Sequence, residues 1–330
     1  MFMKIDNKMS TPLLSVCLIT YNHVKYIRET IDGILMQKVN FPWELIIADD
    51  FSMDGTREII LEYKEKYPDF IKLIFQEKNV GPAKNWLDLI TYPKSKYIAY
   101  LEGDDYWTDP LKLQKQVDYM EAHTECTMCF SAAEIITGDS KKTGNFVRPC
   151  KGNRIFTTGD MILGGGDFFH TGSVLFKKNI IDTLPQWCFE APAGDYPLAL
   201  ICAHKGTVAY IDDIMSVHRS MAKGSWTESM MNNKKNNMEH LNGMIEMLNC
   251  FNRYSDGKFE AAVLYKINWY KKYLLVSQEE SNCLKDPQNK EIFQLLSADQ
   301  KVKFILKLYF PRTFKILFKI KHSLLKHWKD

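Results

Sequence analysis

Apolar runs alternate with amphipathic segments over roughly the first third of the chain, and this alternation predicts a layered α/β fold. The runs are short and almost wholly apolar, which is typical of strands that are covered on both faces of a sheet. We expect strands at residues 13–20, 44–48, 71–75 and 97–101. The segments between them carry apolar residues at helical spacing, so we expect helices at 26–36, at 57–67 and after Pro82. Strands and helices in regular alternation predict a parallel sheet with right-handed crossovers.

The pattern is weaker in the remainder of the chain. Helices are expected at 112–120 and 195–203, and strands at 170–176 and 208–211. Residues 137–160 are polar and have no clear period, so we expect loops there. Between residues 228 and 300 the apolar side chains recur at helical spacing, which predicts a mainly helical region. Members of that pattern are Met238, Leu241, Ile245 and Leu248.

The formal net charge of +3 is unevenly distributed over the 330 residues. Residues 301–330 contain nine Lys or Arg and one acidic residue, whereas the other 300 residues contain 34 basic and 39 acidic ones. An acidic body with a basic tail is not typical of nucleic-acid-binding proteins, so we expect no nucleic-acid partner. Large apolar residues alternate with the basic ones in the tail, and Pro311 divides it into two short helical segments. Such helices bind anionic membrane surfaces, although a helix pair packed on the body is the alternative.

The eight cysteines are scattered singly except for Cys126 and Cys129, which lie in an apolar, strand-like run. We therefore expect buried, reduced thiols rather than a zinc site. The residues before the first strand are few and polar, and no apolar run approaches the length of a membrane span. Together these features favour a cytoplasmic protein, held at the inner face of the cell membrane by its basic tail.

Polar and acidic side chains follow three of the expected strands at the point where each strand ends. They are Thr20, Tyr21 and Asn22 after the first strand, Asp49 and Asp50 after the second, and Glu102, Gly103, Asp104 and Asp105 after the fourth. Because ligands of parallel sheets bind beyond the carboxyl ends of the strands, we expect these residues to share one crevice. Carboxylates this close repel one another unless a cation lies among them. Oxygen ligands suit Mg²⁺ or Mn²⁺, which also bind substrate phosphates, so the sequence indicates an enzyme for a nucleotide-linked substrate.

Four segments, 15–22, 46–56, 79–81 and 101–107, together resemble the motifs of family-2 glycosyltransferases. These are inverting enzymes of the GT-A fold that use nucleotide-activated sugars. The resemblance covers about residues 13–226, and it is specific because four motifs occur in the right order and at the right distances. It implies an α/β, Rossmann-like, mostly parallel central sheet flanked by helices, with a C-terminal helical extension. The implied glycosyltransferase domain is 1–226, with a nucleotide-sugar half at about 13–107 and an acceptor half at about 108–226, followed by a helical region at 227–330.

The resemblance also implies a nucleotide pocket at the strand ends. Tyr21 would stack on the base, and Asp50 would accept the N–H of the base ring, which favours a UDP-sugar as donor. Glu102 stands where the family has the first Asp of its Asp-any-Asp motif, and it would face the ribose or a metal-bound water. The remaining residues implied in this pocket are Thr20, Asn22, Asp49, Asn79, Gly81 and Gly103.

For the metal, Mn²⁺ or Mg²⁺, the resemblance implies Asp104 as the first choice of ligand and Asp105 as the second, with His218 completing the set. Asp195 matches the position of the catalytic carboxylate, which would take the proton of the acceptor hydroxyl in a single inverting displacement. The metal would stabilise the departing diphosphate on the opposite side. His170, Thr171, Arg219 and Trp226 would lie on the acceptor or diphosphate side. The acceptor is expected to be a saccharide or a lipid-linked saccharide, as in the assembly of surface polysaccharide.

Two other functions remain open at this point. A nucleotidyltransferase or sugar-nucleotide synthase also uses carboxylates at strand ends, but that class usually has a Gly-rich, basic loop after its first strand. Here the segment Thr20-Tyr21-Asn22-His23 follows instead. The second alternative is a non-catalytic module that binds a nucleotide-sugar, against which the intact Asp104, Asp105 and Asp195 argue.

Overall fold

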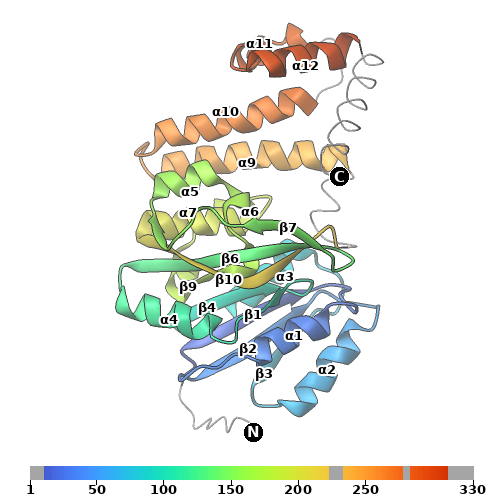
Figure 1. Ribbon diagram of the computed structural model, residues 1–330, viewed down its shortest axis with the longest axis vertical. Coiled ribbons are helices and arrows are strands. Elements are labelled where there is room, and N and C mark those ends of the chain that lie inside the picture. The colour runs from blue at the N-terminus through green and yellow to red at the C-terminus, as the bar shows by residue number, and fades with distance from the viewer. Residues whose placement is uncertain (1–10, 223–232, 278–282, 311–330) are drawn as a thin grey trace.

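A ten-stranded sheet forms the centre of the protein, whose computed structural model describes residues 11–222, 233–277 and 283–310 (Figure 1). Along the sheet the strands follow the order β3 (Ile71–Phe75), β2 (Trp43–Asp49), β1 (Leu14–Thr20), β4 (Tyr97–Glu102), β9 (Leu175–Lys177), β6 (Cys126–Thr137), β10 (Thr207–Ser220) and β5 (Tyr106–Trp107). Beside this path, β7 (Lys142–Val147) pairs with β6, and β8 (Arg154–Phe156) pairs with β10.

The first four strands are parallel and covered on both faces, as the sequence predicted. On one face the core is formed with α1 (Ile27–Leu35), α2 (Thr56–Lys66) and α4 (Lys112–Ala122). On the other face it is formed with α3 (Pro82–Thr91), α5 (Thr158–Gly164) and α7 (Asp195–Lys205). Successive residues of each strand point to opposite faces, which is why these strands are apolar throughout.

The sheet changes direction at β9, which pairs antiparallel with both β4 and β6. Residues 170–176 are therefore not the continuous strand expected from their composition. A short 3-10 helix, η2 (Thr171–Ser173), precedes β9 and turns the chain at the end of β4. The small buried residues Gly172 and Ser173 permit this tight turn between neighbouring strands.

Residues 137–160 are not loops, which corrects the expectation for this segment. They contain β7, β8 and the start of α5. Almost every residue of β7 is exposed, so the strand is held by its antiparallel ladder to β6 and has no buried face. A strand of this kind carries no apolar alternation by which its sequence could be distinguished from a loop.

Helices follow the sheet region, in agreement with the expectation for the described part of residues 228–300. They are α9 (Lys234–Tyr254), α10 (Glu260–Ser277), α11 (Pro287–Gln294) and α12 (Ala298–Tyr309), with short helices α6 (Trp187–Glu190), η1 (Gly166–Phe168), η3 (Lys178–Thr183) and η4 (Cys283–Lys285) elsewhere. Figure 1 shows α9 and α10 side by side above α5 and α7. Buried Leu248 and Phe251 of α9 extend the core of that face, whereas α11 and α12 form a separate small core with Leu275.

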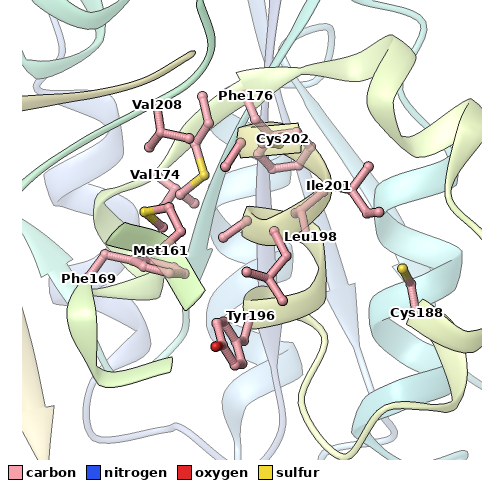
Figure 2. Close-up of a cluster of buried hydrophobic side chains, with 14 of the residues drawn as sticks. Met161, Phe169, Val174, Phe176, Cys188, Tyr196, Leu198, Ile201, Cys202 and Val208 are labelled. Carbon is pink, nitrogen blue, oxygen red and sulfur yellow. The ribbon is translucent and has the colours of Figure 1, made fainter. Parts of the chain in front are cut away.

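Packing of α7 against the sheet fixes the wall nearest the site described below. Figure 2 shows Leu198, Ile201 and Cys202 of α7 beside Val174, Phe176 and Val208. All eight cysteines are free thiols, and Cys126 and Cys129 are buried within β6. Among the described residues, no helix combines the length and the apolar character needed to cross a membrane.

Candidate active site

Strands β1, β2 and β4 end side by side, and their ends bring together the three polar segments noted in the sequence. In the parallel registers, Thr20 lies opposite Asp49 and Ile19 lies opposite Glu102. Beyond the strands the backbone N–H of Asp50 donates to Thr20 O at 3.0 Å, and that of Gly103 donates to Ile19 O at 2.9 Å. The expected convergence on one edge of the sheet is therefore present.

Gly103 allows the acidic segment to approach the end of β1. A Cβ atom on this residue would lie 2.6 Å from Thr20 Oγ1 and 2.7 Å from His23 Nδ1, closer than real Cβ atoms come. Thr20 Oγ1 and His23 Nδ1 are themselves 3.2 Å apart. Any larger side chain at residue 103 would push the carboxylates that follow it away from the crevice.

Asp50 is buried and holds the segment that leads into α3. Its two carboxylate oxygens accept the backbone N–H groups of Val80 at 2.7 Å and Gly81 at 3.0 Å, and the Asn79 amide donates to Asp50 O at 3.4 Å. Gly81 has φ of 86°, a conformation that favours glycine. A carboxylate has about four lone-pair sites, so Asp50 can accept a further N–H from a ligand.

The side chains of Asp49 and Asn22 hold the loop that contains Ser52 and Met53 through hydrogen bonds. Asp49 accepts the Ser52 N–H at 3.0 Å, the Ser52 hydroxyl and the Arg57 guanidinium. The Asn22 side chain accepts the Met53 N–H at 3.0 Å. Tyr21, between these buried contacts, is 44% exposed, so its ring is free to stack on a planar ligand.

Three carboxylates crowd the end of β4. The oxygens of Glu102, Asp104 and Asp105 that could bind an ion lie within 4.8 Å of one another. Burial, then the neighbouring Asp104 and Asp105, raises the pKa of Glu102 well above its usual value. Burial and Asp105 raise the pKa of Asp104 to about 7. A divalent cation among these oxygens would remove this electrostatic cost, so the residues fit a metal ion.

Asp105 also faces two histidines that are distant in the sequence. Its Oδ2 atom lies 3.4 Å from His218 Nδ1 and 3.6 Å from His170 Nε2, while its Oδ1 atom accepts the Arg219 N–H at 2.6 Å. Burial opposes ionisation of Asp105, but the two histidines and this N–H outweigh it and lower its pKa. Burial lowers the pKa of His170 to about 4, so this imidazole is neutral near pH 7.

Arg219 is held by partners within the protein, and its expected contact with phosphate stays a prediction. Its side chain is buried and stacks on Tyr26, with the guanidinium carbon 4.5 Å from the ring centroid. Each guanidinium nitrogen has a partner: Asp104 O at 2.9 Å, Ser140 Oγ at 2.6 Å and Glu29 Oε2 at 2.7 Å. The guanidinium therefore supports the backbone of the acidic segment. The residues next to Arg219 in the sequence give no indication of this role.

Asp195 begins α7, and the adjacent residues His170 and Thr171 link it to the acidic cluster. Thr171 Oγ1 donates to Asp195 Oδ2 at 2.8 Å, and the Tyr196 N–H donates to Oδ1 at 2.7 Å. Burial raises the pKa of Asp195, and these two hydrogen bonds only partly offset it. The charge of Asp195 contributes to the raised pKa of Glu102, so the two carboxylates interact electrostatically. Trp226, expected nearby, lies outside the described residues.

An apolar cavity adjoins Asp195, and one of the residues that line it was not expected from the sequence. Trp86 of α3 lines it together with Tyr100, Thr171, Leu198 and Asp195. The Trp86 ring also lies 3.2 Å from the position of a Cβ on Gly194, so a larger residue there would press on the indole. Nothing in the helical pattern of α3 separates this tryptophan from ordinary core residues.

Lys112 is a second residue without a sequence signal. Its ammonium group is fully buried, 4.3 Å from the centroid of the Trp107 ring, and donates to Gln116 Oε1 at 2.8 Å. Burial lowers the pKa of Lys112 to about 7. A lysine in an amphipathic helix normally extends into solvent, so only the packing of α4 against the sheet reveals this one.

Comparison with known proteins places these motifs in a family. The family described as Glycosyl transferase family 2 matches residues 15–183. An uncharacterized protein of Mycobacterium tuberculosis is 37% identical over 223 residues, which are 67% of this chain and 63% of that protein. This chain therefore spans less than two thirds of the length of that relative. The Escherichia coli UDP-Glc:alpha-D-GlcNAc-diphosphoundecaprenol beta-1,3-glucosyltransferase WfgD is 32% identical over 139 residues, 42% of this chain and 52% of WfgD.

A solved structure shows the same fold. The mannosyltransferase PcManGT of Pyrobaculum calidifontis, in complex with GDP-Man and Mn²⁺, superposes with a TM-score of 0.54 and 15% identity. The superposition covers 96% of this chain and 86% of PcManGT. The expected GT-A fold with C-terminal helices is thereby confirmed.

Proposed function

The chain belongs to glycosyl transferase family 2, and from this premise we propose that it transfers a sugar from a nucleotide-sugar donor to a hydroxyl of a saccharide or lipid-linked saccharide, with inversion. One observation carries the proposal. The carboxylate of Asp195 lies close enough to Glu102 to contribute to its raised pKa, and the adjacent residues His170 and Thr171 link Asp195 to Asp105 of the acidic cluster. An inverting transferase needs this arrangement, because base and departing diphosphate act on opposite sides of the anomeric carbon.

The donor is proposed to be a UDP-sugar. Support comes from the exposed ring of Tyr21, which can stack on a base, and from Asp50, which keeps lone pairs for the N–H of a uracil ring. The relative WfgD, whose name specifies UDP-Glc, is consistent with this choice. Asn22 and Asp49 hold the surrounding loops in place, so their part in binding is to position Tyr21 and Asp50.

We assign the metal to the end of β4, with Asp104, Asp105 and His218 as the ligands that the family resemblance implies, a set that is revised below, and with Mn²⁺ or Mg²⁺ as the ion. When bound, such an ion stabilises the charge of the departing diphosphate. The chain's own contribution is to orient the ligands, since the Arg219 N–H fixes Asp105 and the Arg219 guanidinium fixes the Asp104 carbonyl. Glu102, whose pKa is raised by burial and by its acidic neighbours, is assigned to the ribose side.

Asp195 is assigned as the base. The Thr171 hydroxyl and the Tyr196 N–H each hold one of its oxygens, which directs the carboxylate and leaves lone pairs for the proton of the acceptor hydroxyl. Burial raises its pKa, so the ionised form is a stronger proton acceptor than an exposed aspartate. A small, mostly apolar cavity lies beside it.

We also propose that the protein binds the cytoplasmic surface of the cell membrane through residues 301–330. In the described part of this segment, Phe304 and Leu308 pack into the small core of α11 and α12. Val302, Tyr309 and Phe310 are exposed on the same helix or directly after it. Exposed aromatic residues beside lysines are typical of contact with anionic lipid head groups. Residues 311–330 lie outside the described part of the chain.

A donor panel tests the proposed activity. The purified protein is incubated with UDP-, GDP- and dTDP-sugars, Mn²⁺ and a set of saccharide acceptors, and release of the nucleoside diphosphate by transfer or by hydrolysis is measured for the unmodified protein and for Asp195→Asn. We expect one donor class to be consumed, and the variant to be slower by about 10²- to 10⁴-fold, the usual contribution of a general base. Binding of UDP should be the same in both proteins. If both bind UDP but neither consumes a donor, the chain is a nucleotide-sugar binding module.

A further inference from the structure

We infer that His170 is a ligand of the divalent ion, and that Asp105, His170 and His218 form a site of two imidazoles and one carboxylate that selects Mn²⁺ over Mg²⁺. The inference rests on the metal-dependent function proposed above and deepens it. It transfers His170 from the acceptor side, where the family resemblance placed it, to the metal.

The three side chains converge although they come from separate elements. His170 precedes η2, His218 lies in β10, and Asp105 follows β4. Their ligand atoms lie within 4.8 Å of one another, with the Asp105 oxygen 3.4 Å from one imidazole nitrogen and 3.6 Å from the other. Neighbouring ligands of an octahedral ion with bonds of about 2.1 Å are about 3.0 Å apart, so small side-chain movements would close the site.

His170 Nε2 is a buried atom without a hydrogen-bond partner. Its distance of 3.6 Å from Asp105 Oδ2 is too long for a hydrogen bond. A buried imidazole nitrogen is normally paired, because leaving it unpaired sacrifices its bond to water. A metal ion between the nitrogen and the carboxylate would satisfy both atoms at once.

Gly172 keeps the space next to this nitrogen open. A Cβ atom on Gly172 would lie 2.6 Å from His170 Nε2. The Gly172 carbonyl accepts the indole N–H of Trp107 at 2.7 Å, which fixes the turn that carries His170. Asp105, the third proposed ligand, is also held in place. The backbone N–H of Arg219 donates to Asp105 Oδ1 and leaves Oδ2 facing the two histidines.

The chemistry of the ligands decides which ion is preferred. The alternative set, Glu102, Asp104 and Asp105, offers oxygen alone and would accept Mg²⁺ or Ca²⁺. Imidazole nitrogen favours transition metals, whereas Mg²⁺ prefers oxygen and retains its waters. Asp105 belongs to both sets, so the number of bound nitrogens distinguishes them.

The test uses the full chain with Mn²⁺ as the probe. Electron spin-echo modulation of the Mn²⁺ complex detects directly bound imidazole ¹⁴N, and titration followed by electron paramagnetic resonance gives the affinity. We expect nitrogen modulation in the unmodified protein, and Mn²⁺ affinity reduced at least about tenfold in His170→Gln and in His218→Gln. His123→Gln, a histidine that stacks on Tyr119 in α4, is the matched control and should bind Mn²⁺ unchanged. Mg²⁺, measured by competition, should bind the unmodified protein more weakly than Mn²⁺ by at least about tenfold.

Absence of nitrogen modulation in the unmodified protein would overturn the inference, and this measurement holds even if a variant fails to fold. Unchanged Mn²⁺ affinity in a folded His170→Gln protein would overturn it as well. Donor turnover is measured on the same samples, so the two proposals can be separated. Turnover with an ion bound through oxygen alone would refute the histidine site and leave the transferase, whereas a nitrogen-bound ion without turnover would support the site and count against the transferase.

Discussion

The hydroxyl of Thr171 donates a hydrogen bond of 2.8 Å to Asp195 Oδ2, while Nε2 of the preceding residue, His170, lies 3.6 Å from Asp105 Oδ2. The adjacent residues His170 and Thr171, at the start of η2, therefore contact both Asp195, the proposed base, and the acidic cluster. Because the turn is buried between strands, the spacing between these two halves of the site is set by the rigid sheet.

Removing the Thr171 hydroxyl should change how activity depends on pH. This hydrogen bond lowers the pKa of Asp195 against the effect of burial, so Thr171→Val should raise that pKa further. A base acts only when ionised, and activity is lost as pH falls through its pKa. The acidic limb of the kcat/KM profile should therefore move to higher pH in Thr171→Val. Thr143→Val, which loses an exposed hydroxyl on β7, should keep the original profile. If the acidic limb is unchanged in Thr171→Val, the Thr171 hydroxyl does not influence the pKa of the proposed base.

Asp104 should make the metal-free protein less stable as pH rises. Its folded pKa of about 7 exceeds the ordinary value of 3.8, so the folded state binds more protons than the unfolded state between these values. The stability from this group is thus complete below about pH 4 and lost as pH rises toward 7. Thermal unfolding in EDTA should show a decline over this range that Asp104→Asn reduces.

Added Mn²⁺ should oppose that decline. The ion binds the ionised carboxylates, so the increase in Tm should be larger at pH 7.5 than at pH 5. At a concentration 100 times its Kd, an ion that binds the folded state alone stabilises by about 2.7 kcal/mol. An equal increase in Tm at both pH values would argue against binding at Asp104 and its neighbours.

Arg219 should matter to stability and to metal binding rather than to contact with the donor. Replacing it by Met leaves the Asp104 carbonyl and the Ser140 hydroxyl without their donor and removes the partner of Glu29. The Glu29 carboxylate is half exposed, so the main loss is the unpaired Asp104 carbonyl, which costs about 1–3 kcal/mol of unfolding free energy, to be measured by urea unfolding. Arg28→Met is the control, because the Arg28–Glu62 pair is exposed to solvent and should contribute little to stability. Equal losses of unfolding free energy in the two variants would contradict the proposed role of Arg219 in supporting the acidic segment.

The basic tail can be tested by a truncation placed after Phe310. A cut at residue 301 would remove Phe304 and Leu308 from their core, so loss of binding could reflect loss of packing. Deleting 311–330 instead removes six basic residues, each contributing on the order of 1 kcal/mol near an anionic surface. Co-sedimentation with vesicles containing phosphatidylserine should fall strongly, and neutral vesicles serve as the control. Undiminished binding of the truncated protein would assign membrane contact to another surface.

The strand ends of the nucleotide half could be predicted closely because their signals are local. Expected strands such as 71–75 coincide with β3, and expected helices such as 26–36 differ from α1 by one residue at each end. Buried parallel strands must be apolar, and the turn residues that follow them must be polar. Thus Asp50 and Asp104 could be located at a common sheet edge from spacing alone.

The surroundings of those residues could not be predicted. His170 and His218 are 48 positions apart, and they meet at Asp105 because β9, β6 and β10 lie side by side in the sheet. The burial of Arg219 and of Lys112 likewise has no local signature, since both residue types are normally exposed. The exposed strand β7 could not be predicted for a related reason. Its hydrogen bonds to β6 leave no pattern in the residues of β7 itself.

By itself, the sequence determined the parallel part of the sheet formed by β1 to β4, the edge at which its acidic residues gather and the family to which the chain belongs, because periodicity and short motifs report on neighbours along the chain. The sequence also named Thr171, Arg219, His170 and His218, but the tertiary structure alone decided what each side chain contacts: Thr171 bonds to Asp195, Arg219 supports the acidic segment and the two imidazoles flank Asp105. These contacts join residues that only strand pairing and core packing bring together, and the environments that shift their pKa values arise in the folded chain.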